Sequence, residues 1–209
     1  MDLHIMIGLI GLLYILAFGG IGLLRREGLS IRFAVEAVIV TAIAVLLVVL
    51  VDIQIHPVLF LLVLYFITLR IRILVDLANI FARRGNYVQA EGIYNFAARL
   101  WPDTTNDLII KVNNAILLLQ KNQLDESISM FKDVLIQADN GYLGIKYEAA
   151  SHFNLGVAYL RKGNDSMAII EFNTTIDTWP ASLYANRAET ALERQRHKTT
   201  THVDDKQTE

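Results

Sequence analysis

Residues 155–180 read LGVAYLRKGNDSMAIIEFNTTIDTWP, and residues 77–102 read LANIFARRGNYVQAEGIYNFAARLWP. Both stretches hold a small residue, an aromatic residue three positions later, a Gly-Asn pair, a second small residue, an aromatic four positions further on, and a closing Trp-Pro. The matched positions are Gly156, Tyr159, Gly163, Ala168 and Phe172 in one copy and Ala78, Phe81, Gly85, Ala90 and Tyr94 in the other. A pattern that recurs within one chain indicates an internal structural repeat.

The spacing within each copy predicts two antiparallel helices joined by a tight turn. Helices approach closely only where small residues meet, as at Ala78 with Ala90, and aromatic side chains fill the gaps beside them. Glycine allows the turn, and the proline ends the second helix before the next unit begins.

A weaker copy lies between these two stretches. Its matched positions are Ala115, Leu118, Asn122, Ser127, Phe131 and Val134. The second small position advances by 37 residues from Ala90 to Ser127 and by 41 from Ser127 to Ala168, so we expect the extra residues in the connections. The predicted repeats span residues 71–104, 108–141 and 149–182, followed by a capping helix at 183–196 and a polar, disordered tail at 197–209.

This pattern resembles the tetratricopeptide-repeat (TPR) family, whose usual period is about 34 residues. The resemblance implies an all-α fold, with three helix-turn-helix repeats and a capping helix in an α-solenoid. It also implies a concave groove, lined by the first helix of each repeat, that binds an extended peptide or a helix of a partner protein.

Projecting the family's groove onto this sequence gives a set of candidate peptide-binding residues. They are Arg72, Asp76, Asn79, Arg83, Asn113, Gln120, Asn154 and Arg161. Asn79, Asn113 and Asn154 would form a ladder of amides able to pair with a peptide backbone; the alternative is a solvated face with no ligand. Val75, Ala150 and Asn154 stand where chaperone-binding members need Lys or Arg, so an acidic chaperone C-terminus is not the expected ligand.

The N-terminal third is a membrane anchor by its composition. Residues 1–69 hold three of the 19 Lys and Arg residues and four of the 21 Asp and Glu residues. Three apolar runs predict transmembrane helices at about 5–24, 33–51 and 54–72. The third run has only about twelve unbroken apolar residues, and a buried core helix or a re-entrant segment is the alternative for it.

Arginine placement predicts the orientation of this anchor. Arg25, Arg26 and Arg32 lie around the first connection, and more arginines follow the third run, whereas residues 52–57 contain neither Lys nor Arg. The positive-inside rule then puts the N-terminus outside and the repeat domain in the cytoplasm. The layout resembles that of bacterial and photosynthetic-membrane assembly proteins with a short membrane anchor and about three TPRs, which implies a bacterial cytoplasmic or a photosynthetic membrane.

Small residues follow one face of each of the first two runs. They are Gly8, Gly11, Gly19 and Gly22 in the first run and Ala34, Ala37, Thr41 and Ala44 in the second. Such residues let membrane helices approach closely, so these stripes either pack on each other or dock another membrane subunit. Glu36 lies near the cytoplasmic end, four residues after Arg32, which favours an interfacial ion pair over a transport role.

Composition and motifs argue against catalysis. The chain has no cysteine, its five histidines are dispersed, and it contains none of the common phosphate-loop, metalloprotease or nucleophile motifs. Residues 70–209 carry a net charge of −1, which gives no reason to expect nucleic-acid binding. We therefore expect a non-enzymatic protein without cofactor or metal, in contact with membrane lipid.

The predicted function is a scaffold or adaptor that binds a protein partner at the cytoplasmic membrane face, in the assembly of a membrane complex. The alternative is a permanent subunit of a larger membrane complex, held through its transmembrane helices.

Overall fold

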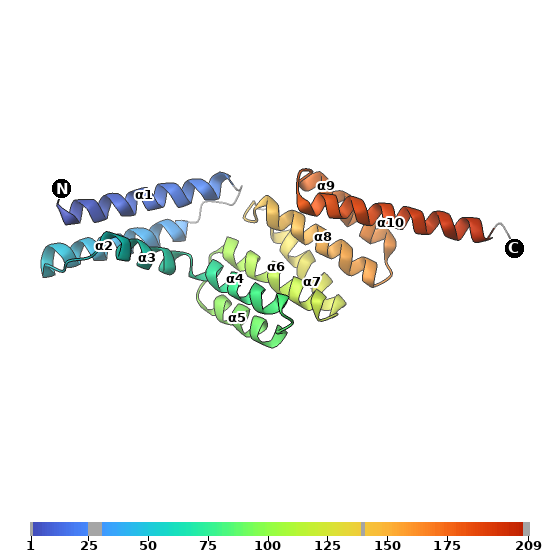
Figure 1. The fold of residues 1–209 in the computed structure, drawn as a ribbon, viewed down its shortest axis with the longest axis horizontal. Helices are drawn as coiled ribbons and strands as arrows, with labels where there is room; N and C mark the ends of the chain where they lie inside the picture. The colour runs from blue at the N-terminus through green and yellow to red at the C-terminus, as the bar shows by residue number, and fades with distance from the viewer. Residues whose placement is uncertain (1, 25–30, 139–140, 207–209) are drawn as a thin grey trace. The chain divides into compact units, whose positions relative to one another are not determined.

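The computed structural model describes residues 2–24, 31–138 and 141–206, and within these ranges it contains ten α-helices and no β-strand (Figure 1). The predicted all-α class is thus confirmed for the described residues. The chain divides into two compact units, Met1–Ile110 and Lys111–Glu209.

Three apolar helices begin the first unit: α1 Leu3–Leu24, α2 Ile31–Val51 and α3 Pro57–Thr68. They pack on one another and bury a cluster made of Ile7, Tyr14, Ala37, Ala44, Phe60 and Leu64. Residues 3–21 and 31–51 are each long and apolar enough to cross a membrane, with mean hydropathies of 2.1 and 2.9. Large apolar side chains such as Leu16, Leu46 and Phe66 point away from the cluster, as expected of helices solvated by lipid.

The third apolar helix, α3, is shorter than the predicted span of 54–72. Residues 52–56 are not helical, and α3 begins at Pro57 with His56 as its N-cap, whose Nδ1 accepts from the Val58 amide at 3.3 Å. It ends at Thr68, and α4 Arg70–Arg83 leaves at an angle of 71°. The predicted continuous helix through residue 72 is therefore broken at Leu69.

The helices α4 and α5 Tyr87–Arg99 lie side by side as the first helical hairpin (Figure 1). Ala78 and Ala90 are fully buried, and the ring of Tyr94 is 1 % exposed. At the turn, the Asn86 amide donates to Phe81 O at 3.0 Å, the Gly85 amide donates to Ala82 O at 3.0 Å, and Gly85 has φ +79°. This is a Schellman turn, in which the left-handed residue satisfies the last carbonyls of the helix.

Five further helices follow: α6 Thr104–Gln120, α7 Leu124–Ala138, α8 Ile145–Arg161, α9 Asp165–Thr178 and α10 Leu183–Lys206. The first residues of α6 belong to the first unit and the rest to the second. In the second unit, α7 packs on α8, α8 packs on α9, and α10 packs on both α8 and α9.

The turn of the first hairpin recurs twice. Between α6 and α7, the Gln123 amide donates to Leu118 O at 2.9 Å and Asn122 has φ +62°. Between α8 and α9, the Asn164 amide donates to Tyr159 O at 2.9 Å and Gly163 has φ +79°. Gly85, Asn122 and Gly163 therefore occupy one conformation at three equivalent places in the sequence.

Burial recurs at the same intervals. Tyr94, Phe131 and Phe172 are buried at the aromatic position of the second helix, and Ala97, Val134 and Thr175 are buried three residues later. Ser127 replaces the alanine of the other hairpins, and its buried hydroxyl donates to Ala115 O at 2.9 Å.

The last helix is longer than the predicted cap of 183–196. It runs to Lys206, through most of the segment predicted to be disordered. Residues 183–206 contain neither Gly nor Pro, so no residue type in this stretch ends the helix.

Candidate functional site

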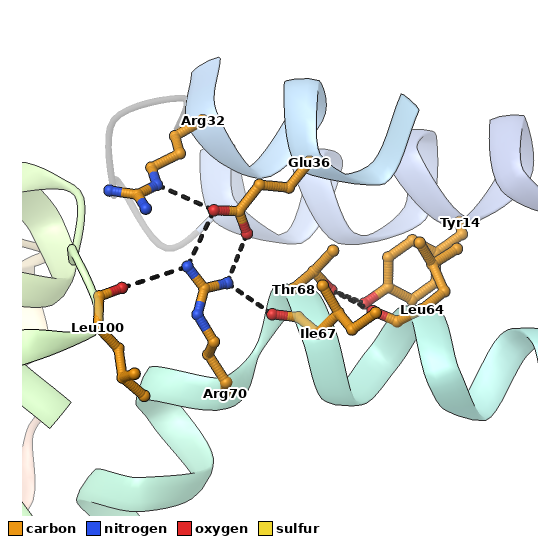
Figure 2. A network of polar contacts seen from close by, with 8 residues as sticks. All are labelled: Tyr14, Arg32, Glu36, Leu64, Ile67, Thr68, Arg70 and Leu100. Atoms are coloured by element: carbon orange, nitrogen blue, oxygen red, sulfur yellow. Dashed lines mark hydrogen bonds and ion pairs between the residues drawn. The ribbon is translucent and has the colours of Figure 1, made fainter. Parts of the chain in front are cut away.

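The side chain of Arg70, at the start of α4, joins the apolar helices α2 and α3 to the first hairpin (Figure 2). Its Nη1 donates to Glu36 Oε2 at 2.6 Å, and its Nη2 donates to Glu36 Oε1 at 2.9 Å. Paired parallel hydrogen bonds of this kind are the strongest arrangement between arginine and a carboxylate. They fix the end of α3 against the beginning of α2.

Arg32 completes the pairing of Glu36. Its Nε donates to Glu36 Oε1 at 2.9 Å, as predicted from the four-residue spacing on α2. The contribution of Arg70, 34 residues away, was not foreseen from the sequence. Glu36 thus meets two guanidinium groups, which suits a structural ion pair at the end of an apolar helix better than a proton relay.

Arg70 also binds two carbonyl groups at helix ends. Nη1 donates to Ile67 O in the last turn of α3 at 2.7 Å, and Nη2 donates to Leu100 O, the C-cap residue of α5, at 3.3 Å. Carbonyls in the last turn of a helix have no partner within the helix, and cationic side chains satisfy them well. One side chain therefore links α2, α3 and α5.

A second polar contact joins α1 to the last turn of α3 (Figure 2). The Thr68 hydroxyl donates to Leu64 O at 2.8 Å and lies 2.6 Å from the Tyr14 hydroxyl. Because threonine has one hydroxyl proton, Tyr14 is the donor to Thr68. Bonding of a threonine to the carbonyl four residues earlier bends helices, and here it occurs directly before the break at Leu69.

These residues border an open cleft of about 610 Å³ in the first unit. Its apolar lining comes from the helices α1 and α3, with Ile15, Phe18 and Tyr65. The segment after α5 contributes Trp101, Asp103 and Asn106. The cleft therefore lies where the end of the apolar helices meets the first hairpin.

The predicted groove residues of the first hairpin differ in their availability. Asp76 and Arg83 are exposed, and Arg72 is half-buried. Asn79 Oδ1 accepts from the Tyr94 hydroxyl at 2.7 Å. Burial raises the pKa of Tyr94, which keeps the hydroxyl in its donating form.

In the second unit, the predicted groove residues are also partly engaged within the chain. Asn113 is only 8 % exposed, Asn154 Nδ2 donates to Ala150 O at 2.7 Å, and Arg161 Nη1 donates to Leu119 O at 3.0 Å. Gln120 and Arg161 are exposed. Asn79 and Asn154 of the predicted amide ladder thus already form hydrogen bonds within the chain, and Asn113 is buried. The exposed residues among the groove candidates are Asp76, Arg83, Gln120 and Arg161.

The small residues of α1 and α2 contribute unequally to packing. A Cβ atom added at Gly11 would come within 3.0 Å of the Thr41 Cβ, whereas one added at Gly8 would meet nothing within 4 Å. Ala37 and Ala44 are buried in the cluster, and Gly19 and Ala34 line the cleft. The surroundings of Gly22, and the residues Arg25 and Arg26, lie outside the described part of the chain.

Among the described residues, no group of three or more His, Asp or Glu residues is placed to hold a metal ion. Comparison with models of known protein families gives no match, and comparison with curated proteins gives none either.

Proposed function

We propose that the chain is a membrane-anchored helical-repeat adaptor of the TPR type, which binds a protein partner at the cytoplasmic membrane face during assembly of a membrane complex. The observation that carries this proposal is the threefold recurrence of one hairpin turn, at Gly85, Asn122 and Gly163, together with the buried positions that accompany it. Helical repeats of this kind are built to present extended binding surfaces.

The Glu36 ion pairs support the proposed orientation. Arg32 at the beginning of α2 and Arg70 after the end of α3 bind the same carboxylate, so both lie at one end of the membrane helices. The connection at residues 52–56, without Lys or Arg, follows the other end of α2. Basic residues at one end only are what the positive-inside rule requires of a cytoplasmic side.

A third membrane crossing is part of the proposal. The 12 residues of α3 rise only about 18 Å, less than the apolar core of about 30 Å. The five non-helical residues 52–56 add up to about 17 Å when extended. Ile55 packs on the buried cluster of α1–α3, and non-helical backbone at membrane depth is tolerated where protein covers it.

The partner-binding surface can be tested by purifying the full chain in mild detergent and identifying bound proteins by mass spectrometry. We expect Asp76→Ala with Gln120→Ala to reduce partner recovery while the protein stays in the membrane. The matched control is Gln89→Ala with Asn173→Ala, which removes equally exposed side chains from second helices of the hairpins. Equal recovery by both double variants would contradict a groove on the first helices.

The second candidate is a subunit held through its membrane helices, and the open space at Gly8 favours it. The space beside Gly11 is filled by the Thr41 side chain, whereas a Cβ added at Gly8 would have no atom within 4 Å. Gly8→Leu therefore leaves the internal packing of α1 intact and blocks only an external helix. If Gly8→Leu loses its bound partners while Asp76→Ala with Gln120→Ala recovers them normally, this second candidate is supported instead.

A further inference from the structure

We propose that the corner formed by Phe96, Arg99 and Trp101 is a lipid-binding surface that lies in the headgroup layer of the membrane beside the anchor. This inference rests on the membrane insertion of α1 and α2 in the proposed function. It adds a second contact with the bilayer, made by the repeat region itself.

The position of the corner follows from the Arg70 contacts. Arg70 binds Leu100 O, next to Trp101, and also binds Glu36 in the second turn of α2 (Figure 2). Trp101 lines the same cleft as Gly19, Gly20 and Ile21, the last residues of the first apolar segment. The corner is therefore level with the ends of the two membrane helices, where apolar core gives way to headgroups.

The exposed chemistry of the corner matches that layer. Trp101 is 78 % exposed and Phe96 is 53 % exposed, and the exposed Arg99 lies between them in sequence. Tryptophan is enriched at membrane–water boundaries because its ring is apolar and its N–H is polar. An arginine beside it can pair with lipid phosphate groups.

The equivalent Trp-Pro of the third copy provides an internal comparison. Trp179 has φ −148°, an extended conformation that is ordinary for a residue before proline, and its side chain is partly buried. Trp101 has φ +49°, a left-handed conformation that is unfavourable for a non-glycine residue. The copy in the first unit thus holds its indole exposed in a left-handed backbone, and the copy in the second unit does not.

The two tryptophans of the chain allow a direct test. Trp179→Phe leaves Trp101 as the only indole, and Trp101→Phe leaves Trp179. Each full-length variant is reconstituted at low protein density in phosphatidylcholine vesicles whose acyl chains are brominated either near the glycerol or near the methyl end. We expect Trp101 emission to be blue-shifted and quenched most by bromine near the glycerol.

Other outcomes would overturn the inference. Red-shifted Trp101 emission that is quenched by aqueous acrylamide and by neither brominated lipid would place the corner in water. A blue-shifted Trp101 that neither brominated lipid quenches would place it against protein, such as a second copy of the chain. Flotation of Trp101→Phe with the vesicles reports membrane insertion separately, so failure of the anchor is distinguished from failure of the corner.

Discussion

At the scale of single residues, Arg70 has the largest structural role in the first unit. Its guanidinium binds one carboxylate and two helix-end carbonyls, and its side chain is 27 % exposed while that of Glu36 is 22 % exposed. Partly buried pairs of this kind contribute more than surface pairs, because removing one partner leaves the other incompletely solvated.

Arg70→Met is therefore expected to destabilise the full chain by about 2 kcal/mol, the scale of hydrogen bonds to charged groups. Removing both charges in Arg70→Met with Glu36→Gln should cost less than the sum of the single changes. Chemical unfolding in detergent, followed by circular dichroism, measures each value. Arg84→Met at an exposed position is the control; a similar loss there would show that Arg70 has no special role.

This contact could not be predicted from the sequence, although Glu36 with Arg32 could. Arg32 is one helical turn from Glu36, so the spacing alone brings them together. Arg70 reaches Glu36 only because the chain bends at Leu69, and residues 67–71 contain neither Pro nor Gly to signal a bend. The bend is accompanied instead by tertiary contacts, between Thr68 and Tyr14 and between Arg70 and Glu36.

At the scale of elements, the helical hairpins were largely predictable because their signals are local. Gly85 and Gly163 mark turns, and the buried aromatic positions follow at fixed intervals. The burial of Asn113, which is 8 % exposed, was not predictable in this way, because burial of a polar helix residue depends on tertiary packing and not on local sequence signals.

The turn geometry predicts opposite effects for two glycines of the first hairpin. Gly85→Ala should destabilise the chain by about 1 kcal/mol, because φ is +79° and a Cβ is unfavourable there even with no atom within 4 Å. Gly92→Ala, in the interior of α5 with the same open space, should instead stabilise by up to about 1 kcal/mol. Thermal melts of both variants test the pair, and two changes of the same sign would contradict this account of the turn.

A close contact in the third hairpin predicts a larger effect. A Cβ added at Gly156 would lie 2.7 Å from Cε1 of Phe172, whose side chain is fully buried. Gly156→Ala should therefore cost about 1–3 kcal/mol through overpacking. Reducing the ring in the double variant Gly156→Ala with Phe172→Leu should recover part of that loss. If Gly156→Ala proves neutral in denaturant unfolding, the two helices are not in close contact at this position.

At the scale of the whole molecule, the apolar part of the sequence and the repeats form separate stretches of the chain. The first unit contains the apolar helices and the first hairpin, and the second contains the remaining hairpins and α10. The number of crossings decides which side of the membrane holds the repeats, since two crossings return the chain to its starting side and three do not.

The absence of cysteine from the chain makes the crossings measurable. We expect Gln54→Cys, in the second connection, to react with a membrane-impermeant maleimide in intact cells, and Gln89→Cys on α5 to react only after permeabilisation. Labelling of both in intact cells would mean that α3 does not cross. Labelling of Gln89→Cys alone would reverse the proposed orientation.

The Arg70 junction also has a mechanical consequence. If a partner of the proposed kind pulled on the first hairpin, the force would pass through Arg70 to Glu36 and to the end of α3, because the same guanidinium binds both. The hairpin and the anchor would then tilt as one rigid lever until these hydrogen bonds rupture. The proposed anchor, rather than a flexible linker, would then resist the movement of that partner.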